Sequence, residues 1–375
     1  MKILHFVNGR CNFDSANGVD KTVYYLTREL AAIGNDVHLI SATEKEVIPI
    51  EGVTIHKVAP FTPTLWCSRE VSKLIKALEP DFGHLHSAYV PENIAVARYF
   101  RKLEVPYVVT PNGNCSRSLM KRKPWIKGPY KMILERPYLN QAAFIHSVGD
   151  ETEIKHYGVK VPILEALNGI DLTTLPQGIE KKPVSTIVPA FSDRFVFVFV
   201  GRLDIEQKGL DLLIEAVALL KKEGLKPGVL LVGPCWKGSR VRIEAMIQDA
   251  GVKDCFHLQG PAYGEEKFEM VVAGGAFIHA SRWEGLPFSV VEAMAMNQLC
   301  VVTPAADPAG RIAAKKAGVN CDLSAEGIAK GMRQAMSLKP EERNDLIANS
   351  AEIVRSDMDW SHIARRVSDG YRKFR

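Results

Sequence analysis

The sequence lacks the cysteine spacing of disulfide-rich and zinc-binding proteins. Its seven cysteines lie far apart and form no CxxC pair, which is typical of free thiols in a reducing compartment. It also lacks any run of about 18 apolar residues, the length that spans a bilayer. The apolar run at its N-terminus is too short for a signal peptide. We therefore expect a cytoplasmic protein.

Motifs for metal binding and nucleophilic catalysis are equally scarce. The one Asp-x-Asp is Asp357-Met358-Asp359, in which Asp359 is expected to cap a terminal helix. There is no Gly-x-Ser-x-Gly elbow. His84 and His86 face the same way on a predicted strand, but no acidic or cysteine partner accompanies them. We expect a hydrogen-bonded His84 in the core, His86 at the edge of a cleft, and no metal or other cofactor.

The composition is that of an ordinary globular protein. The 375 residues are 46% hydrophobic and 24% charged, and this length allows two domains that each bury a core. The net charge of +5 makes the surface mildly basic. That charge suits an anionic ligand or an anionic membrane, and it is too weak to indicate nucleic acid.

Short apolar runs alternate with helical patterns along the chain. Val19, Val23, Leu26 and Leu30 recur on one face of a helix that ends at Gly34. Strands separated by helices imply βαβ units and parallel sheets covered on both faces. The predicted strands are 3–7, 37–40, 84–86, 107–110, 144–148, 163–166, 195–200, 229–232, 256–258, 276–279 and 300–302.

Two similar α/β halves flank a proline-containing segment. The periodicity fails in residues 173–193, a stretch that carries three prolines. We interpret it as a linker between an N-terminal domain, 1–172, and a C-terminal domain, 194–358. Because open parallel sheets bind ligands beyond the carboxyl ends of their strands, the chemistry should lie in the loops that follow strands.

The first such loop, residues 201–209, follows the predicted strand 195–200. Arg202 can grip a phosphate with two N–H groups and Lys208 can act as a point charge. The helix beyond Gly209 adds backbone N–H donors. The loop is therefore a candidate clamp for a diphosphate. The alternative is a solvated pair of cations, with Gly209 as an ordinary turn residue.

The second loop and the helix after it cover residues 280–294. Gly285 allows a ligand to approach the backbone closely, and Pro287 suits the first turn of the following helix. Glu284 on the loop and Glu292 inside the helix are suited to gripping sugar and ribose hydroxyls. The alternative is that these acids complement an ordinary helix start.

Two further segments carry weaker signals. Asn17-Gly18 places a glycine at the first predicted helix, where the backbone comes close to a neighbour or a ligand. Residues 117–131 interleave six cations with apolar and aromatic side chains, as in proteins that rest on anionic membranes. The alternative for this segment is a solvated basic helix face.

Taken together, these motifs resemble the GT4 family of glycosyltransferases. The pattern is Glu284-x7-Glu292 followed by Ala-Met-Ala, with Gly201-Arg202 and Lys208-Gly209 upstream. Further segments resemble the family in the same order along nearly the whole chain: Asp81-Phe-Gly-His-Leu-His-Ser, Thr110-Pro-Asn-Gly, Asn168-Gly-Ile-Asp171 and Asp359-Trp360. The resemblance implies the GT-B fold, in which two Rossmann-like, doubly wound parallel-sheet domains face a central cleft. It also implies that the C-terminal helix, 359–375, packs back on the first domain.

The resemblance implies a role for each matched residue. Arg202 and Lys208 would neutralise the leaving diphosphate, and with Glu284 they form the expected catalytic set. Glu292 would hold the ribose, and Gly18 would lie by the phosphates or the acceptor. The transferred sugar would be held by Glu284 and by the loop amides of Gly285, Leu286, Pro287 and Phe288. The acceptor side would include Asn17, His86 and Asn112.

The chain departs from the family pattern at three places. Asn112 stands where family members usually carry His, and Asn cannot titrate near neutrality. Met296-Asn297 replaces the usual Cys-Gly, but Asn tolerates the left-handed conformation that Gly supplies. Ala305-Ala306 stands near the usual Gly-Gly. None of these departures touches the expected diphosphate clamp.

The expected activity is transfer of a hexose or related sugar from a nucleotide-diphosphate donor to a hydroxyl acceptor, with retention of configuration and without metal. Family analogy favours surface polysaccharide, lipopolysaccharide or glycolipid assembly. If residues 117–131 rest on the inner face of the cell membrane, the acceptor is expected to be lipid-linked. Two alternatives stay open: another GT-B enzyme such as a nucleotide-sugar epimerase, and a non-catalytic module that binds a nucleotide sugar or a membrane.

Overall fold

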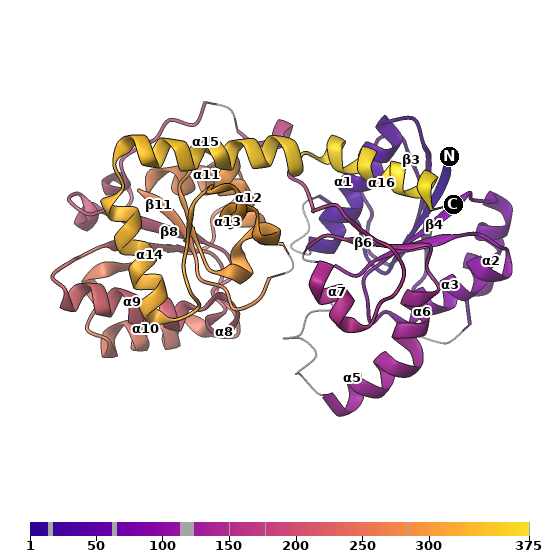
Figure 1. Ribbon diagram of the computed structural model, residues 1–375, viewed down its shortest axis with the longest axis horizontal. Coiled ribbons are helices and arrows are strands. Elements are labelled where there is room, and N and C mark those ends of the chain that lie inside the picture. The colour runs from indigo at the N-terminus through magenta and orange to yellow at the C-terminus, as the bar shows by residue number, and fades with distance from the viewer. Residues whose placement is uncertain are drawn as a thin grey trace. The chain divides into compact units, whose positions relative to one another are not determined.

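The structure is a computed structural model that describes residues 1–13, 18–61, 66–112, 124–149, 151–176, 178–284 and 286–374. The chain forms two compact units, Met1–Gly169 with Asp357–Arg375 and Ile170–Ser356 (Figure 1). The predicted architecture of two α/β units with parallel sheets is confirmed. Residues 173–193, which we expected to be a linker, are part of the second unit, where Val184 and Phe191 are buried.

A seven-stranded parallel sheet forms the centre of the first unit, in the order β3-β2-β1-β4-β5-β6-β7. The strand order reverses between β1 and β4, as in doubly wound folds. The strands are β1 (Lys2–Val7), β2 (Asp36–Ala42), β3 (Val53–Val58), β4 (Phe82–His86), β5 (Tyr107–Thr110), β6 (Phe144–Ser147) and β7 (Ile163–Glu165).

Helices cover both faces of the first sheet. Ile3 and Phe82 face α1 and α16, whereas Leu4 and Leu85 face α2 and α3, because successive side chains of a strand point to opposite faces. Asp359 caps the C-terminal helix by accepting the N–H of Ser361, as expected. The helices are α1 (Gly18–Ala32), α2 (Arg69–Leu78), α3 (Pro91–Lys102), α5 (Pro124–Tyr130), the π-helix η1 (Lys131–Glu135), α6 (Arg136–Asn140), α7 (Glu151–Tyr157) and α16 (Trp360–Lys373).

The second unit has a six-stranded parallel sheet in the order β10-β9-β8-β11-β12-β13. Here the order reverses between β8 and β11. The central strand β8 has the sequence VFVFV and is buried along its whole length, as expected for β-branched and aromatic residues in a sheet covered on both faces. The strands are β8 (Val196–Val200), β9 (Gly228–Val232), β10 (Phe256–Leu258), β11 (Ala276–His279), β12 (Cys300–Val302) and β13 (Val319–Asn320).

Two layers of helices enclose this second sheet. Phe197 and Phe199 pack among side chains of α9, α10 and α14 on one face, while α11 contacts β8 and α12 contacts β11 and β12. The helices are α8 (Ile205–Lys208), α9 (Leu210–Lys222), α10 (Ser239–Asp249), α11 (Gly264–Ala273), α12 (Phe288–Ala295), α13 (Arg311–Lys315), α14 (Ala325–Ser337) and α15 (Pro340–Asp357). Short 3-10 turns lie at Leu172–Thr174, Val184–Thr186, Pro189–Phe191, Lys253–Cys255, Pro304–Ala306 and Pro308–Gly310.

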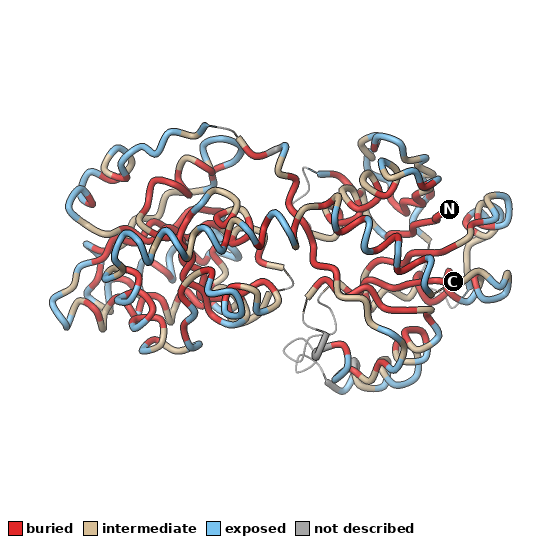
Figure 2. The backbone as a smooth tube through the Cα atoms, turned by 45° about the horizontal axis from the view of Figure 1, so that its top comes forward, coloured by how far each residue is buried: buried red, intermediate tan, exposed pale blue. Residues whose placement is uncertain are grey.

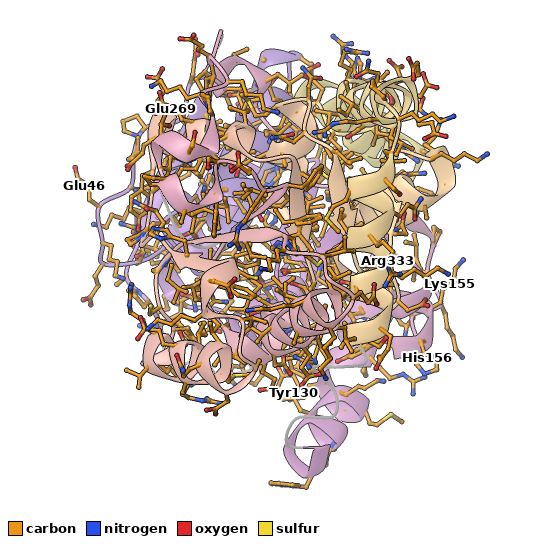
Figure 3. All side chains as sticks on the ribbon, turned by 90° about the vertical axis from the view of Figure 1, so that its left-hand side faces the viewer. Glu46, Tyr130, Lys155, His156, Glu269 and Arg333 are labelled. Atoms are coloured by element: carbon orange, nitrogen blue, oxygen red, sulfur yellow. The ribbon has the colours of Figure 1, made fainter. Side chains whose placement is uncertain are left out.

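Buried backbone follows the strands in both units, and exposed backbone follows the outer turns of the helices (Figure 2). Glu269 and Arg333, labelled in Figure 3, belong to exposed ion pairs with Lys182 and Glu223. Such pairs add little stability because water screens them. A search of the described helices finds none with the length and apolarity needed to cross a bilayer.

Candidate active site

Two loops meet at the point where the strand order of the second sheet reverses. Strands β8 and β11 are parallel neighbours, so their carboxyl ends lie at the same edge. The chain after β8 runs through α8 to Gly209, and the chain after β11 runs from Ala280 to α12. Ligands of doubly wound sheets bind at this place. The structure therefore brings the two loops that we selected from the sequence together.

Gly209 allows the two loops to touch. Its φ is +61°, and a Cβ added there would lie 2.2 Å from the carbonyl oxygen of Ala280. Any other residue would clash with that backbone as well as adopt an unfavourable conformation. The Arg282 N–H donates to the Gln207 carbonyl at 2.9 Å and joins the loops a second time.

Lys208 and Glu284 are in direct contact. The Lys208 Nζ lies 2.6 Å from Glu284 Oε1, and the two side chains are only 12% and 8% exposed. Ser281 Oγ donates to the same oxygen at 2.6 Å, and His279 Nε2 lies 3.1 Å from it. The second oxygen, Oε2, has a longer contact of 3.5 Å with Gln207 Nε2. Three donors thus converge on one carboxylate oxygen.

The protonation states of this group follow from burial and hydrogen bonding. Burial lowers the pKa of His279, although the neighbouring carboxylate opposes that effect. Burial alone would raise the pKa of Glu284, but the hydrogen bonds from His279 and Lys208, together with the positive charge of Lys208, outweigh it and lower the pKa. Glu284 is therefore an ionised, buried carboxylate beside a cation, and His279 is a neutral donor near neutral pH.

Arg202 lies in a different environment. Its exposed guanidinium donates to Gln207 Oε1 at 3.1 Å and stacks over the Trp236 ring, 4.4 Å from the ring centroid. These partners are neutral, so Arg202 brings positive charge to the mouth of the site. A guanidinium held on a ring keeps its remaining N–H groups available for an anion.

Glu292 projects from α12 toward α11. Its Oε1 accepts from Lys267 Nζ at 2.8 Å, and the two side chains are 19% and 21% exposed. The carboxylate expected to hold ribose is therefore already paired with a lysine. Sequence reasoning missed Lys267, because nothing in the spacing of α11 links it to α12.

The loop before α12 matches the expectation in part. Gly285 lies outside the described residues. Pro287 precedes α12 as its cap and not as a residue of its first turn. The N–H of Phe288 donates to the Leu286 carbonyl at 3.0 Å, so this amide must leave that carbonyl before it can bind a sugar oxygen.

Gly18, expected by the phosphates or the acceptor, and the acceptor-side residue Asn112 lie in the first unit, after strands β1 and β5, which are separated by β4. Gly18 is the first residue of α1, and Asn112 follows β5 with a φ of +53°. Asn112 donates to the Thr110 carbonyl, and its buried Oδ1 has no hydrogen-bond partner in the described part of the chain. Asn17 lies outside the described residues. His86 is buried and 1% exposed, so our placement of it at the edge of a cleft was wrong.

His86 belongs to a buried cluster of histidines. His5 Nδ1 lies 3.0 Å from His86 Nε2, and His84 bonds Tyr371 and Thr110 through its two nitrogens. The rings of His84 and His86 are stacked, with an angle of 14° between their planes. Three histidines, His5, His84 and His86, are close enough to share a metal ion, but His5 Nδ1 already bonds His86 Nε2, and both nitrogens of His84 bond protein groups.

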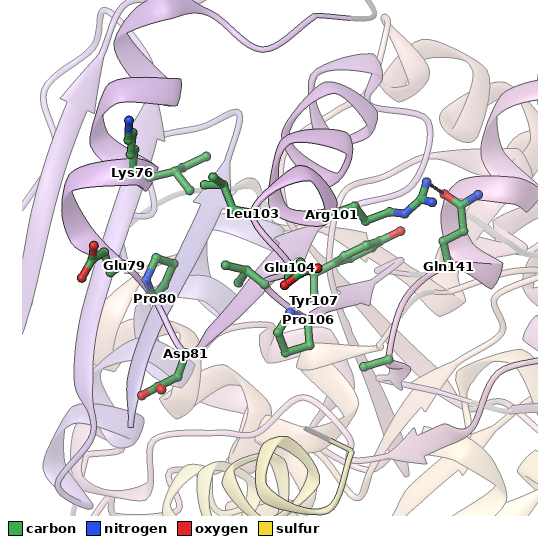
Figure 4. A pocket seen from close by; sticks show the side chains of 13 residues that line it. Lys76, Glu79, Pro80, Asp81, Arg101, Leu103, Glu104, Pro106, Tyr107 and Gln141 are labelled. Atoms are coloured by element: carbon green, nitrogen blue, oxygen red, sulfur yellow. Dashed lines mark hydrogen bonds between the residues drawn. The ribbon is translucent and has the colours of Figure 1, made fainter.

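A hollow of about 890 Å³ lies at the opposite edge of the first sheet (Figure 4). Asp81, Pro106 and Ala143 line it, and they directly precede β4, β5 and β6, respectively. Figure 4 shows Arg101 bonded to Gln141 at its rim. None of the expected site residues that the structure describes lines this hollow. It is at the amino ends of the strands and not at the carboxyl ends where ligands bind.

Two family models match the chain. The model described as Glycosyltransferase Family 4 matches residues 16–174, and the model described as Glycosyl transferases group 1 matches residues 182–353. Together they span most of both units. The chain belongs to the GT4 glycosyltransferases. An uncharacterized glycosyltransferase of Methanocaldococcus jannaschii is 28% identical over 107 residues, which is 28% of this chain and 25% of that relative.

Solved glycosyltransferase structures share the GT-B fold over the whole chain. Sucrose-phosphate synthase from Thermosynechococcus elongatus has a TM-score of 0.75 at 16% identity, covering 100% of this chain and 99% of its own. HepE of Anabaena in complex with UDP and glucose has a TM-score of 0.71 at 15% identity, with 100% of both chains covered. WaaG, a glycosyltransferase involved in lipopolysaccharide biosynthesis, has a TM-score of 0.67 at 17% identity, covering 98% of this chain and 99% of its own.

Proposed function

We propose that this GT4 enzyme moves a sugar from a nucleotide-diphosphate donor to a hydroxyl acceptor with retention of configuration. The observation that carries the proposal is the contact of Lys208 with Glu284 at 2.6 Å. At the carboxyl ends of β8 and β11 it brings together a cation suited to binding phosphate and a carboxylate suited to binding sugar hydroxyls. A diphosphate and the sugar attached to it need both kinds of group within a few ångströms of each other.

In the proposed mechanism, Lys208 and Arg202 neutralise the diphosphate as it leaves. Charge grows on the leaving group in the transition state, so fixed cations lower the barrier, and each is worth on the order of 3 kcal/mol in other enzymes. Glu284 holds the transferred sugar and Glu292 the ribose. The leaving phosphate takes the acceptor proton on the same face of the sugar, which retains the configuration. No residue of the proposed set needs a metal.

Uridine diphosphate sugars are the first donors to test. The HepE structures contain UDP or UDP-glucose, which supports a donor of this class for the present chain. Binding of a donor to the native state raises the unfolding temperature by mass action. A panel of UDP-, GDP-, ADP- and TDP-sugars should therefore yield one class that raises it.

Turnover distinguishes the proposal from its alternatives. A transferase releases nucleotide diphosphate with an acceptor, an epimerase converts the donor without one, and a binding module does neither. Lys208→Met and Glu292→Gln should lower turnover at least about 100-fold while leaving the fold intact. The matched control is Lys222→Met, an exposed lysine at the far end of α9. Normal turnover by both site variants would refute the site assignment.

The exposed face of α5 and η1 supports a lipid-linked acceptor. Trp125, Met132 and Ile133 are exposed to 74%, 57% and 71%, and α5 stands out from the body of the first unit (Figure 1). Exposed apolar residues beside cations suit the surface of an anionic membrane. The remainder of the basic segment, 117–123, lies outside the described residues.

Vesicle sedimentation tests this docking. The chain should bind vesicles with anionic lipid more than neutral ones, and the double variant Trp125→Ser with Ile133→Ser should lose that binding. Trp66→Ser is the control, since Trp66 is 81% exposed elsewhere on the same unit. Equal binding by the double variant and the wild type would exclude this face as the docking surface.

A further inference from the structure

His279 is the last residue of β11 and does not belong to the set assigned above. It is 1% exposed, and its ring stacks on Phe199 with centroids 5.1 Å apart and 11° between the planes. Its Nε2 lies 3.1 Å from Glu284 Oε1. A polar ring in the middle of an apolar sheet costs free energy unless its nitrogens are satisfied. Within the described residues, only Nε2 has a partner.

The geometry fixes the tautomer of His279. An ionised carboxylate only accepts hydrogen bonds, so Nε2 must carry the proton that points at Glu284. Nδ1 is buried and has no hydrogen-bond partner within the described residues. A proton on Nδ1 would be an unsatisfied buried donor, which is why burial favours the neutral ring.

The donors around Glu284 are distributed unequally between its two oxygens. Lys208, Ser281 and His279 converge on Oε1 at 2.6, 2.6 and 3.1 Å, whereas Oε2 has one contact with the described residues, at 3.5 Å. The backbone beneath is held as well, because Thr303 Oγ1 donates to the Ser281 carbonyl at 2.7 Å. One oxygen is thus anchored and the other is left to accept from a ligand.

We propose that His279, with Ser281, is a positioning residue that anchors Glu284 Oε1, so that Oε2 is presented to a hydroxyl of the transferred sugar. The proposal rests on the function proposed above. It assigns no contact between His279 and substrate. His279 acts through Glu284, by holding it ionised and at a fixed rotation about its last bond.

Two substitutions at the same position separate the hydrogen bond from the ring. His279→Gln keeps an N–H near the place of Nε2, and His279→Phe keeps a stacked ring without a donor. His279→Phe should lower kcat/KM for the donor about 10- to 100-fold, the range for a hydrogen bond to a charged group. His279→Gln should recover most of that loss. UDP contains no transferred sugar, so its inhibition constant should stay the same in both variants.

The pH profile gives a second readout. Loss of the donor raises the pKa of Glu284, so the acid limb of kcat/KM should move to higher pH by about 1 unit or more in His279→Phe. Ser281→Ala should move it in the same direction without any change of ring. His56→Phe, on the edge strand β3, is the control substitution. A generally weakened second unit would lower UDP affinity as well and would leave the acid limb in place.

Direct titration of the Glu284 carboxyl makes the test independent of turnover. In protein with 13C-labelled glutamate carboxyl groups, the Glu284 signal is the one lost in Glu284→Gln. Its pKa should be higher in His279→Phe than in the wild type. An unchanged pKa with normal turnover would overturn the role of His279. If the wild type turns over no nucleotide sugar, the proposed function fails, and with it the sugar contact of Oε2, whatever the titration shows.

Discussion

Acidification should destabilise the first unit before most of its carboxylates titrate. Four buried histidines lie under α16, on β1, β4 and β6: His5, His84, His86 and His146. Burial lowers the pKa of His5 to about 3 and that of His146 to about 4. It lowers the pKa values of His84 and His86 as well, and the neighbouring histidines add to the effect.

The direction of the effect follows from proton counting. In the unfolded chain a histidine binds a proton below about pH 6.5, whereas these four stay neutral in the native state. The unfolded state therefore binds more protons, and stability falls as the pH falls from 6.5 toward the native pKa values. In that window each histidine lowers the free energy of unfolding by about 1.4 kcal/mol for every pH unit of acidification. Four of them cost about 5.5 kcal/mol between pH 7.5 and 5.5.

One carboxyl group opposes this loss. Glu135, on the π-helix, is 1% exposed, and burial raises its pKa to about 7. Glu135 takes up a proton in the native state while it stays ionised in the unfolded chain. Over the same pH interval it therefore raises the free energy of unfolding by about 2 kcal/mol. The net loss for the first unit is about 3.5 kcal/mol, a large part of the 5–15 kcal/mol typical of a domain.

Native-state hydrogen exchange can measure this unit by unit. Opening free energies of amides in β1 and β4 should fall by about 3.5 kcal/mol from pH 7.5 to 5.5 after correction for intrinsic rates. Amides in β8 and β11 are the internal control, because the second unit buries one such histidine, His279, whose pKa burial lowers, and should lose much less stability than the first unit. His146→Gln should reduce the loss in the first unit by about 1.4 kcal/mol. Equal losses in the two units would refute the reasoning.

Three further substitutions have defined outcomes. Gly209→Ala should lower the free energy of unfolding of the second unit by more than about 2 kcal/mol. The control is Gly224→Ala, where φ is +83° but the added Cβ meets open space, and it should lower that free energy by about 1 kcal/mol. Equal shifts of the two variants in thermal unfolding would count against the loop contact. Glu292→Gln should change stability by less than about 1 kcal/mol, because its ion pair is partly exposed, yet weaken donor binding in calorimetry at least about 10-fold. Tyr371→Phe removes the hydroxyl that lies 2.5 Å from His84 Nδ1. The free energy of unfolding of the first unit, measured with denaturant, should fall by about 1 to 3 kcal/mol. An unchanged free energy of unfolding would contradict the importance of this hydroxyl.

The sequence was sufficient to predict most of the sheet framework. Long apolar runs such as Val196–Val200 are buried on both faces and leave no ambiguity. The edge strand β3 was missed because Val53–Val58 is mostly half-exposed and lacks such a run. The strand β13 has two residues, too few for any periodicity. Asn297 adopts the positive φ that we expected where the family carries glycine.

The candidate site was predictable in its loops and not in its contacts. Loops 201–209 and 280–287 could be selected because each follows a buried strand. The bond between Lys208 and Glu284 joins residues 76 positions apart and depends on which strands are neighbours. His279 is preceded in its strand by apolar residues, so nothing marked it as a partner of Glu284. His86 was misplaced because the residues that bury it, including His5, come from distant parts of the chain.

The pairing of the site's charges before any substrate arrives explains how a buried clamp can exist at all. Because Lys208 pairs with Glu284 and Lys267 with Glu292, none of these four charges is isolated. An isolated charge would be costly in a poorly hydrated place. The pairing does not block a donor. An ammonium has three N–H groups and a carboxylate two oxygens, so each partner can bond the ligand without releasing the other. Because the geometry is already fixed, a donor would lose little free energy in ordering these side chains. Arg202 has only neutral partners among the described residues, so it would then supply the positive charge that balances the negative diphosphate.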